Sequence, residues 1–218
     1  MEKRIMIVDT ETIGIDKPFV YDIGIVVAEL QGTRYEAISK DSFIIKQIYD
    51  NRILFETAYY AEKRPLYTRK MKGRKTIRKY WGHVARYIDR LAKIHGIKEI
   101  YAYNVDFDKR AVETTSRILK TYQPLKHSIY KDIMAIASAY IHDTKDYQDY
   151  CRDNRAVTPK GYIQTNAERT YQYLTQNKSF IEEHTGLSDA LIELEILNDC
   201  IIKGYDNKKE YRKRFIRA

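Results

Sequence analysis

Four carboxylates and one histidine are the residues of this sequence best suited to chemistry on a charged substrate. Asp9 and Glu11 lie in the run Ile-Val-Asp-Thr-Glu-Thr-Ile-Gly, and Asp108 ends Tyr-Asn-Val-Asp-Phe-Asp. His184 and Asp189 share His-Thr-Gly-Leu-Ser-Asp. Carboxylates packed together repel one another unless cations neutralise them, and hard oxygen ligands favour Mg²⁺ or Mn²⁺ over zinc. Two such ions about 4 Å apart, beside a histidine that accepts a proton near neutral pH, can cleave a phosphodiester.

The first pair of carboxylates follows a mostly apolar run, Arg4–Asp9, which is typical of a short buried strand. Because side chains alternate along a strand, Asp9 and Glu11 share one face and Thr10 lies on the other. A lone Asp-x-Glu is common on protein surfaces. Its place at the end of a buried strand, where a loop admits substrate, is what points to a site.

The remaining candidates each have an ordinary structural role as an alternative. Asp108 follows a strand at the start of a helix, where an N-cap is usual, and Asp106 competes with it for either role. Asp189 falls in the first turn of a helix, where capping or a dipole contact is usual. A loop His184 is ordinarily a surface residue, but a Gly-containing loop places it near Asp189. We interpret Asp132, at a strand end, as the cap of the next helix.

Hydrophobic periodicity predicts the elements that must position these residues. The expected strands are Arg4–Asp9, Tyr21–Leu30, one within Tyr35–Lys46, Ile100–Asn104 and Ser128–Asp132. The expected helices are Ile77–Ile94, Asp108–Leu119, Ile133–Ile141 and Ser188–Ile202. Three strands with short turns, then strands alternating with helices, predict an α/β fold. We expect a mixed sheet of about five strands, the first three antiparallel, flanked by helices. No repeat or linker divides it, so we expect one domain, 1–203, and a basic tail, 204–218.

The charge balance favours a polyanionic partner. The formal net charge is +9, and nucleic acid is the commonest partner of so basic a protein. The segment Arg69–Lys79 has seven cations and no acid, and the tail from Lys208 to Arg217 has only one acid. Both segments can clamp phosphates or simply be solvated. Twenty tyrosines can stack on unpaired bases, although an AT-rich genome also enriches tyrosine.

The composition argues against membrane insertion and secretion. No apolar run approaches the ~20 residues that span a bilayer. The run Ile5–Val8 is too short for the apolar part of a signal peptide. Cys151 and Cys200 lie far apart, without zinc-ligand spacing, and suit a reducing compartment. We therefore expect a cytoplasmic protein.

Taken in order, these residues resemble the DEDDh family of DnaQ-like 3′-to-5′ exonucleases, which have a ribonuclease H-like fold. The matching segments are residues 9–14, 102–108 and 184–190, with 21–26 resembling the strand after the first motif. The match runs from Ile5 to about Cys200. The resemblance implies a two-metal enzyme, using Mg²⁺ or Mn²⁺, that releases nucleoside 5′-monophosphates from single-stranded or frayed 3′ ends. Both DNA and RNA stay open as substrates.

The resemblance also implies roles for the individual residues. Asp9 would bridge both metals, and Glu11, Asp108 and Asp189 would complete the metal shells. His184 would be the general base.

Further positions follow from the same alignment. It makes Asp108 the ligand rather than Asp106, and it places Thr12, Ile15 and Phe107 against the terminal nucleotide.

Two features depart from the family pattern. Family members often have a histidine where Tyr103 stands, next to Asn104. Residues 50–73 have no counterpart and can be a specific insertion or a substrate arm. The basic segments also support a second hypothesis, a nucleic-acid-binding or polymerase-associated module with a vestigial site. The complete set of carboxylates argues against that hypothesis, since a binding module has no need to hold such repulsion. A polymerase or replication protein fits as a partner under either hypothesis.

Overall fold

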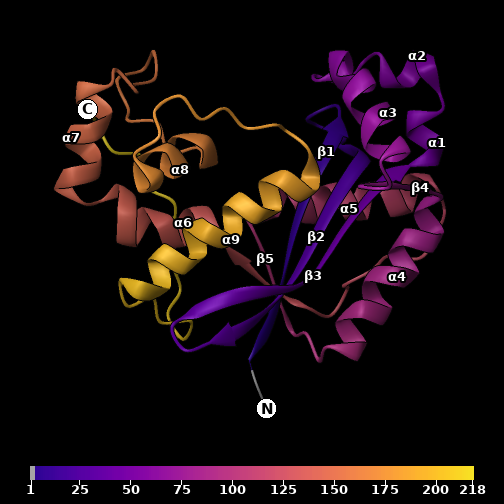
Figure 1. The fold of residues 1–218 in the computed structure, drawn as a ribbon, viewed down its shortest axis with the longest axis horizontal. Helices are drawn as coiled ribbons and strands as arrows, with labels where there is room; N and C mark the ends of the chain where they lie inside the picture. The colour runs from indigo at the N-terminus through magenta and orange to yellow at the C-terminus, as the bar shows by residue number, and fades with distance from the viewer. Residues whose placement is uncertain (1–2) are drawn as a thin grey trace.

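A mixed six-stranded sheet forms the centre of the molecule, seen in a computed structural model that describes residues 3–218 (Figure 1). Met1 and Glu2, at the start of the expected domain, lie outside the described residues. The strands are β1 (Arg4–Ile13), β2 (Phe19–Gln31), β3 (Arg34–Ile45), β4 (Ile77–Lys79), β5 (Glu99–Ala102) and β6 (Ile129–Asp132). Their order across the sheet is β4-β3-β2-β1-β5-β6.

The first three strands are antiparallel, as the sequence predicted. β5 runs parallel to β1, and β6 runs parallel to β5. Gly32 makes the tight turn between β2 and β3 with a φ of +64°. The α/β class is confirmed, but the sheet has six strands rather than about five. The extra strand is β4, because the helix expected from Ile77 begins only at Trp81 and residues 77–79 pair instead with β3.

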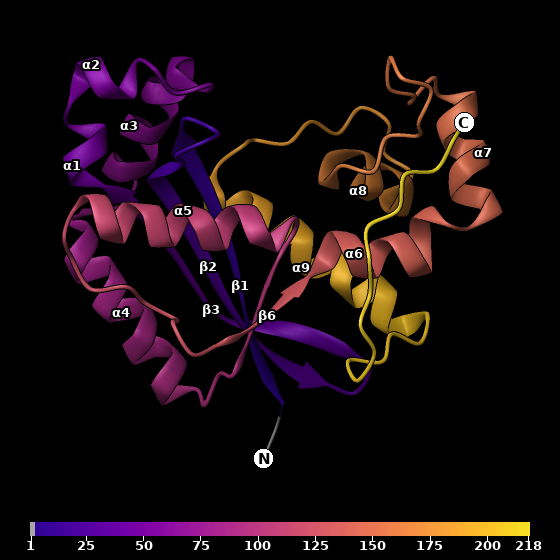
Figure 2. The same cartoon turned by 180° about the vertical axis from the view of Figure 1, so that it is seen from behind.

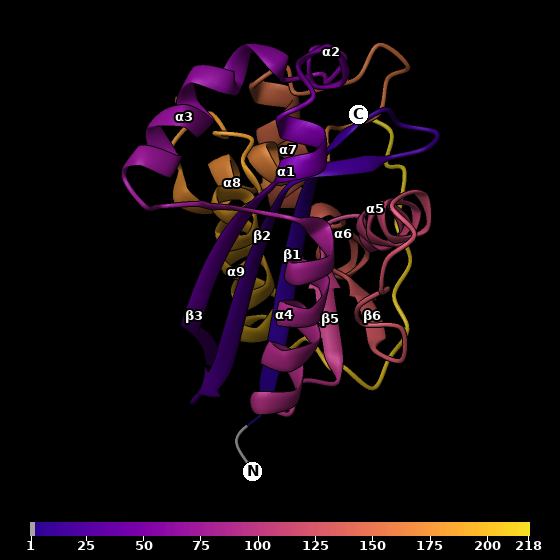
Figure 3. The ribbon, with the colours of Figure 1, turned by 90° about the vertical axis from the view of Figure 1, so that its right-hand side faces the viewer.

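Helices cover both faces of the sheet (Figure 3). The helices are α1 (Lys46–Tyr49), α2 (Arg52–Phe55), α3 (Arg64–Lys72), α4 (Trp81–Ile94), α5 (Val105–Ile118), α6 (Ile133–Ala137), α7 (Lys145–Asp153), α8 (Ala167–Thr175) and α9 (Gly186–Ile202), with a 3₁₀ turn η1 (Ala61–Lys63) and a π turn η2 (Ser138–His142). Met6 and Val8 of β1 pack toward α4 and α5, whereas Ile5 and Ile7 pack toward α6 and α9. Within residues 3–218, no helix is long and apolar enough to cross a membrane.

Two segments lie outside this sandwich. Residues 50–73, which we call the arm, carry α2, η1 and α3 beside the end of β1 (Figure 1). The tail, residues 204–218, returns along α6 toward α7 (Figure 2). The Ile163 N–H donates to the Ile216 carbonyl at 3.0 Å, and Lys213 forms a 3.0 Å ion pair with Asp132. The basic tail is therefore packed on the body of the protein, and part of its charge is already paired.

Candidate active site

β1 carries the first two candidate carboxylates on the face that α9 covers. Ile5 and Ile7 belong to the hydrophobic cluster on that face, and the two-residue period continues to Asp9 and Glu11. The strand is longer than the sequence predicted and ends at Ile13, with an irregularity in its pairing just after Glu11. Both carboxylates therefore sit on the strand itself, at the end where pairing with β2 becomes irregular.

Two glycines bring the start of α9 against the strands. A Cβ on Gly24 would lie 2.0 Å from the Gly186 carbonyl carbon, and a Cβ on Gly186 would lie 2.4 Å from the Gly24 nitrogen. Only glycine permits this approach. The Gly186 N–H also donates to Asp22 Oδ2 at 2.9 Å. His184 and Asp189, on either side of Gly186, are thereby held next to Asp9 and Glu11.

α5 begins three residues earlier than the sequence predicted, so Asp108 lies in the first turn and is not the N-cap. Its Oδ1 accepts hydrogen bonds from the Thr10 N–H at 3.0 Å and from the Thr10 hydroxyl at 2.7 Å. Asp106 is exposed, so the structure separates the two competing aspartates. Asp132 accepts the N–H of the third residue of α6 at 3.2 Å, which confirms its interpretation as a cap.

Burial and mutual repulsion raise the pKa values of these carboxylates above those of the same groups in water. The pKa of Asp9 lies well above its ordinary value because of burial first, and then because of the neighbouring charges of Glu193 and Asp108. Burial is also the largest cause that raises the pKa of Glu11 to about 8 and those of Asp108 and Asp189 to about 7. A divalent cation would relieve this repulsion and displace the protons.

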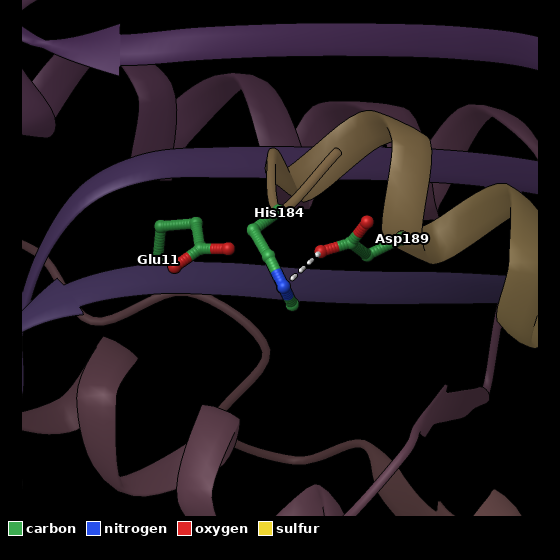
Figure 4. Close-up of side chains that lie close together, drawn as sticks. All are labelled: Glu11, His184 and Asp189. Carbon is green, nitrogen blue, oxygen red and sulfur yellow. Dashed lines mark ion pairs between the residues drawn. The ribbon is translucent and has the colours of Figure 1, made fainter. Parts of the chain in front are cut away.

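His184 lies beside three carboxylates, Glu11, Glu182 and Asp189. Its Nδ1 is 3.6 Å from Glu182 Oε2 and 4.0 Å from Asp189 Oδ2. Glu11, His184 and Asp189 each offer a ligand atom within 4.8 Å of the others (Figure 4). Burial and the nearby charge of Lys63 lower the pKa of His184, which favours the neutral, proton-accepting form.

The structure adds carboxylates that the sequence analysis missed. Glu193 lies one turn after Asp189 on α9, is 2% exposed and accepts the Tyr103 N–H. Asp22 is buried near the start of β2 and accepts the Gly186 N–H at the start of α9. The sequence carried a signal for both: Glu193 lies four residues after Asp189, on the same face of the helix, and Asp22 lies inside an apolar strand. Glu182 had no comparable signal, because only the folded loop brings it to His184.

Unpartnered oxygens show that this group fits a hard cation. Among the described residues, Asp22 Oδ1, Asp189 Oδ1 and Glu193 Oε2 are buried without a hydrogen-bond partner. Buried polar atoms are ordinarily paired. A set of buried carboxylate oxygens with spare acceptor capacity suits Mg²⁺ or Mn²⁺.

Of the expected nucleotide contacts, Thr12 and Phe107 are chain neighbours of Glu11 and Asp108, and Ile15 lies in the loop after β1. Ile15 is 76% exposed, and its carbonyl accepts a 3.4 Å hydrogen bond from Arg110. The Arg110 guanidinium also lies 5.6 Å from the centre of the Phe107 ring, so Arg110 brings Ile15 and Phe107 together. The Thr12 hydroxyl donates to the Gly14 carbonyl within the same loop.

Tyr103, which stands where members of the resembled family often have a histidine, uses its hydroxyl for contacts at α8. Its hydroxyl donates to the Thr165 carbonyl and lies 3.2 Å from the Thr170 hydroxyl. Its side chain therefore ties β5 to α8, while its backbone N–H reaches Glu193.

This chain is similar to known proteins in its structure, but no match was found by sequence. No family model and no curated protein matches this chain. The product-bound structure of exonuclease I matches with a TM-score of 0.58 and 12% identity, covering 91% of this chain and 43% of that chain. E. coli exonuclease I in complex with a 5cy-dT13 oligonucleotide matches with a TM-score of 0.54 and 12% identity, covering 91% and 40%. The ExoI/SSB-Ct complex matches with a TM-score of 0.54 and 12% identity, covering 94% and 42%.

The match covers nearly all of this chain but only about two fifths of each of those proteins. At 12% identity the likeness shows the fold. The six-stranded mixed sheet with helices on both faces is the arrangement that the neighbours share. The protein has the ribonuclease H-like fold of exonuclease I, as the sequence predicted.

Proposed function

We propose that this protein is a DEDDh 3′-to-5′ exonuclease that releases nucleoside 5′-monophosphates from single-stranded or frayed 3′ ends. One observation carries the proposal. Side chains from β1, α5 and α9 converge as a group of carboxylates, half-buried at Asp9 and Glu11 and buried at Asp108 and Asp189, whose pKa values are raised, beside a histidine whose pKa is lowered. A purely structural role gives no reason to bury so many like charges together.

The carboxylates of Asp9, Glu11, Asp108 and Asp189 would hold two Mg²⁺ or Mn²⁺ ions. Their oxygens are of the type these ions prefer, and Asp189 Oδ1 has no protein partner. When bound, such ions neutralise phosphate charge and lower the pKa of the attacking water. The Thr10 hydrogen bonds fix the Asp108 carboxylate, so its position is set before a cation arrives.

His184 would accept the proton of the attacking water. Its Nδ1 faces Glu182 and Asp189, which leaves Nε2 as the nitrogen free to act as the base. The water oxygen forms the new bond to phosphorus, and the 3′ oxygen of the preceding nucleotide leaves with the strand. The product is a nucleoside 5′-monophosphate, held by Ile15 and by stacking on Phe107.

Single-stranded nucleic acid is the substrate we favour. The neighbouring structures include an E. coli ExoI-ssDNA complex and an ExoI/SSB-Ct complex. In this chain, Lys72, Arg74 and Arg78 line an open groove of about 560 Å³ beside β4, which can accept a phosphate backbone. A replication protein is a candidate partner by the same analogy. Two buried free thiols, Cys151 and Cys200, suit the cytoplasmic location that we expect.

A matched pair of variants on one turn of α5 tests the proposal. Asp108→Ala should abolish metal-dependent degradation of a 5′-labelled single strand, whereas Asp106→Ala, an exposed acid two residues away, should retain it. Asp9→Ala should behave like Asp108→Ala and keep its far-UV circular dichroism spectrum. Retained full activity in Asp9→Ala would contradict the site. A nucleic-acid-binding module with a vestigial site would instead show no thermal stabilisation by Mn²⁺.

A further inference from the structure

The arm is fixed to the body of the protein by aromatic packing. Phe55 and Tyr67 are buried, and both rings pack edge-on against Tyr21 of β2, with centroids 5.0 and 5.8 Å away. The Arg64 guanidinium lies 5.0 Å from the Phe55 ring centre. Aromatic pairs of this geometry add to the burial energy of the rings. The arm is therefore a rigid support and can set the position of whatever it touches.

What it touches is the loop that carries His184. The Lys63 ammonium donates to the Glu183 carbonyl oxygen at 2.7 Å. The Lys70 ammonium donates to the Thr185 hydroxyl at 2.7 Å and also to the Glu183 carboxylate. Both chain neighbours of His184 are thus held by lysines of the arm.

The ring of His184 is held by the arm as well. The Tyr60 ring stacks on the imidazole with centroids 4.4 Å apart and an interplanar angle of 14°. The Lys63 ammonium lies 4.2 Å from the centre of the same Tyr60 ring. In a parallel stack the Tyr60 ring covers the face of the imidazole and not its edge, so Tyr60 does not block Nε2.

The backbone of His184 shows why such support is needed. Its φ is +49°, in the left-handed region that costs a residue other than glycine about 1 kcal/mol or more. A residue keeps such a conformation only where its surroundings determine it. Here the surroundings are the two lysine contacts on its neighbours and the tyrosine ring on its side chain.

We propose that Tyr60 is a positioning residue that holds the His184 ring in the orientation needed for proton abstraction. Lys63 and Lys70 support this role by holding the two chain neighbours of His184. This inference rests on the proposed function, because it takes His184 to be the base. It assigns a role to the arm, which has no place in the family pattern. The arm acts through His184 and does not itself touch the reacting phosphate.

Kinetics on three variants test the inference. Tyr60→Leu removes the ring and should lower kcat about tenfold or more with KM within about twofold of wild type, since misplacing a catalytic group slows only the chemical step. Tyr60→Phe keeps the ring and should restore kcat. Tyr80→Leu is the matched control, because Tyr80 also contacts a histidine and a lysine, His83 and Lys46, but on α4 and α1. It should leave both constants unchanged.

A spectroscopic measurement provides a readout independent of activity. The protein has five histidines, so His184→Ala identifies the imidazole signals of His184 in an NMR spectrum of histidine-labelled protein. Ring-current shielding by Tyr60 should shift these signals, and Tyr60→Leu should return them toward free-histidine positions. Tyr80→Leu should leave them in place.

The outcomes separate the two proposals. If wild type is active and Tyr60→Leu is equally active, the positioning role is overturned and the proposed function stands. The same holds if the imidazole signals do not move in Tyr60→Leu. A rise in KM with unchanged kcat would also overturn it, since Tyr60 would then be a substrate contact. A wild type without exonuclease activity would overturn the proposed function and, with it, this inference.

Discussion

Replacing Asp189 by asparagine should stabilise the metal-free protein at neutral and higher pH. Burial, followed by the charge of Asp22, raises the pKa of Asp189 from 3.8 to about 7. The folded protein therefore holds this proton to a higher pH than the unfolded chain does. Wild-type stability should fall as pH rises from about 4 to about 7, and the loss should be complete above that range.

The size of the effect follows from the shift. A rise from 3.8 to about 7 corresponds to about 4 kcal/mol, at about 1.4 kcal/mol per pH unit. Neighbouring carboxylates relieve part of the repulsion by binding protons themselves, and an amide must also be buried in the variant. We therefore expect Asp189→Asn to gain about 2 kcal/mol at pH 8 and little at pH 4.

Urea unfolding in EDTA at several pH values measures this gain. Asp16→Asn, on an exposed residue near the end of β1, is the matched control and should show no pH-dependent gain. Adding Mn²⁺ should make wild type more stable than Asp189→Asn, because Mn²⁺ binding stabilises the folded wild type and the variant lacks one of the metal ligands. If Asp189→Asn is no more stable than wild type at pH 8 without metal, charge repulsion at Asp189 does not destabilise the protein. If Mn²⁺ stabilises Asp189→Asn as strongly as wild type, Asp189 is not a metal ligand.

Three further predictions concern the surroundings of the site. Glu193→Gln keeps an acceptor for the Tyr103 N–H but removes a charge facing Asp9, so it should weaken Mn²⁺ stabilisation in a thermal-shift titration; an unchanged midpoint would remove Glu193 from the site. The acidic limb of kcat against pH should lie below pH 6.5 in saturating Mn²⁺, because burial and Lys63 lower the pKa of the base, and Lys63→Met should move the limb to higher pH. Arg74→Ala should weaken binding of single strands equally for all sequences and reduce the salt dependence by about one charge, measured by fluorescence anisotropy; a sequence-dependent loss would argue against a phosphate contact.

The parts of the fold and site predicted from sequence depend on local patterns. The alternation along β1 placed Asp9 and Glu11 on one face because side chains on a strand repeat every two residues. The glycine between His184 and Asp189 predicted that these two residues lie close together. The structure shows the reason, which is the close backbone contact between Gly24 and Gly186. The cap role of Asp132 followed from its place before a helix.

The parts not predicted depend on contacts between distant segments. β4 is a strand because its backbone completes the edge of β3, although Ile77 continues a helical pattern in the sequence. The short helices of the arm hold together through Phe55 and Tyr67 packed on Tyr21, which no local periodicity indicates. The stack of Tyr60 on His184 is of the same kind, since only tertiary structure brings these rings together.

A cleavage assay on three forms of one strand tests whether the protein degrades nucleic acid from a free 3′ end. A 5′-labelled single strand with a free 3′ hydroxyl, the same strand with a blocked 3′ end, and a closed circle are each incubated with the protein in Mg²⁺ or Mn²⁺, as DNA and as RNA. We expect stepwise shortening from the free 3′ end, release of nucleoside 5′-monophosphates, protection of the blocked strand and an intact circle. Cleavage of the circle, or no metal-dependent degradation of either nucleic acid, would contradict the proposed exonuclease activity.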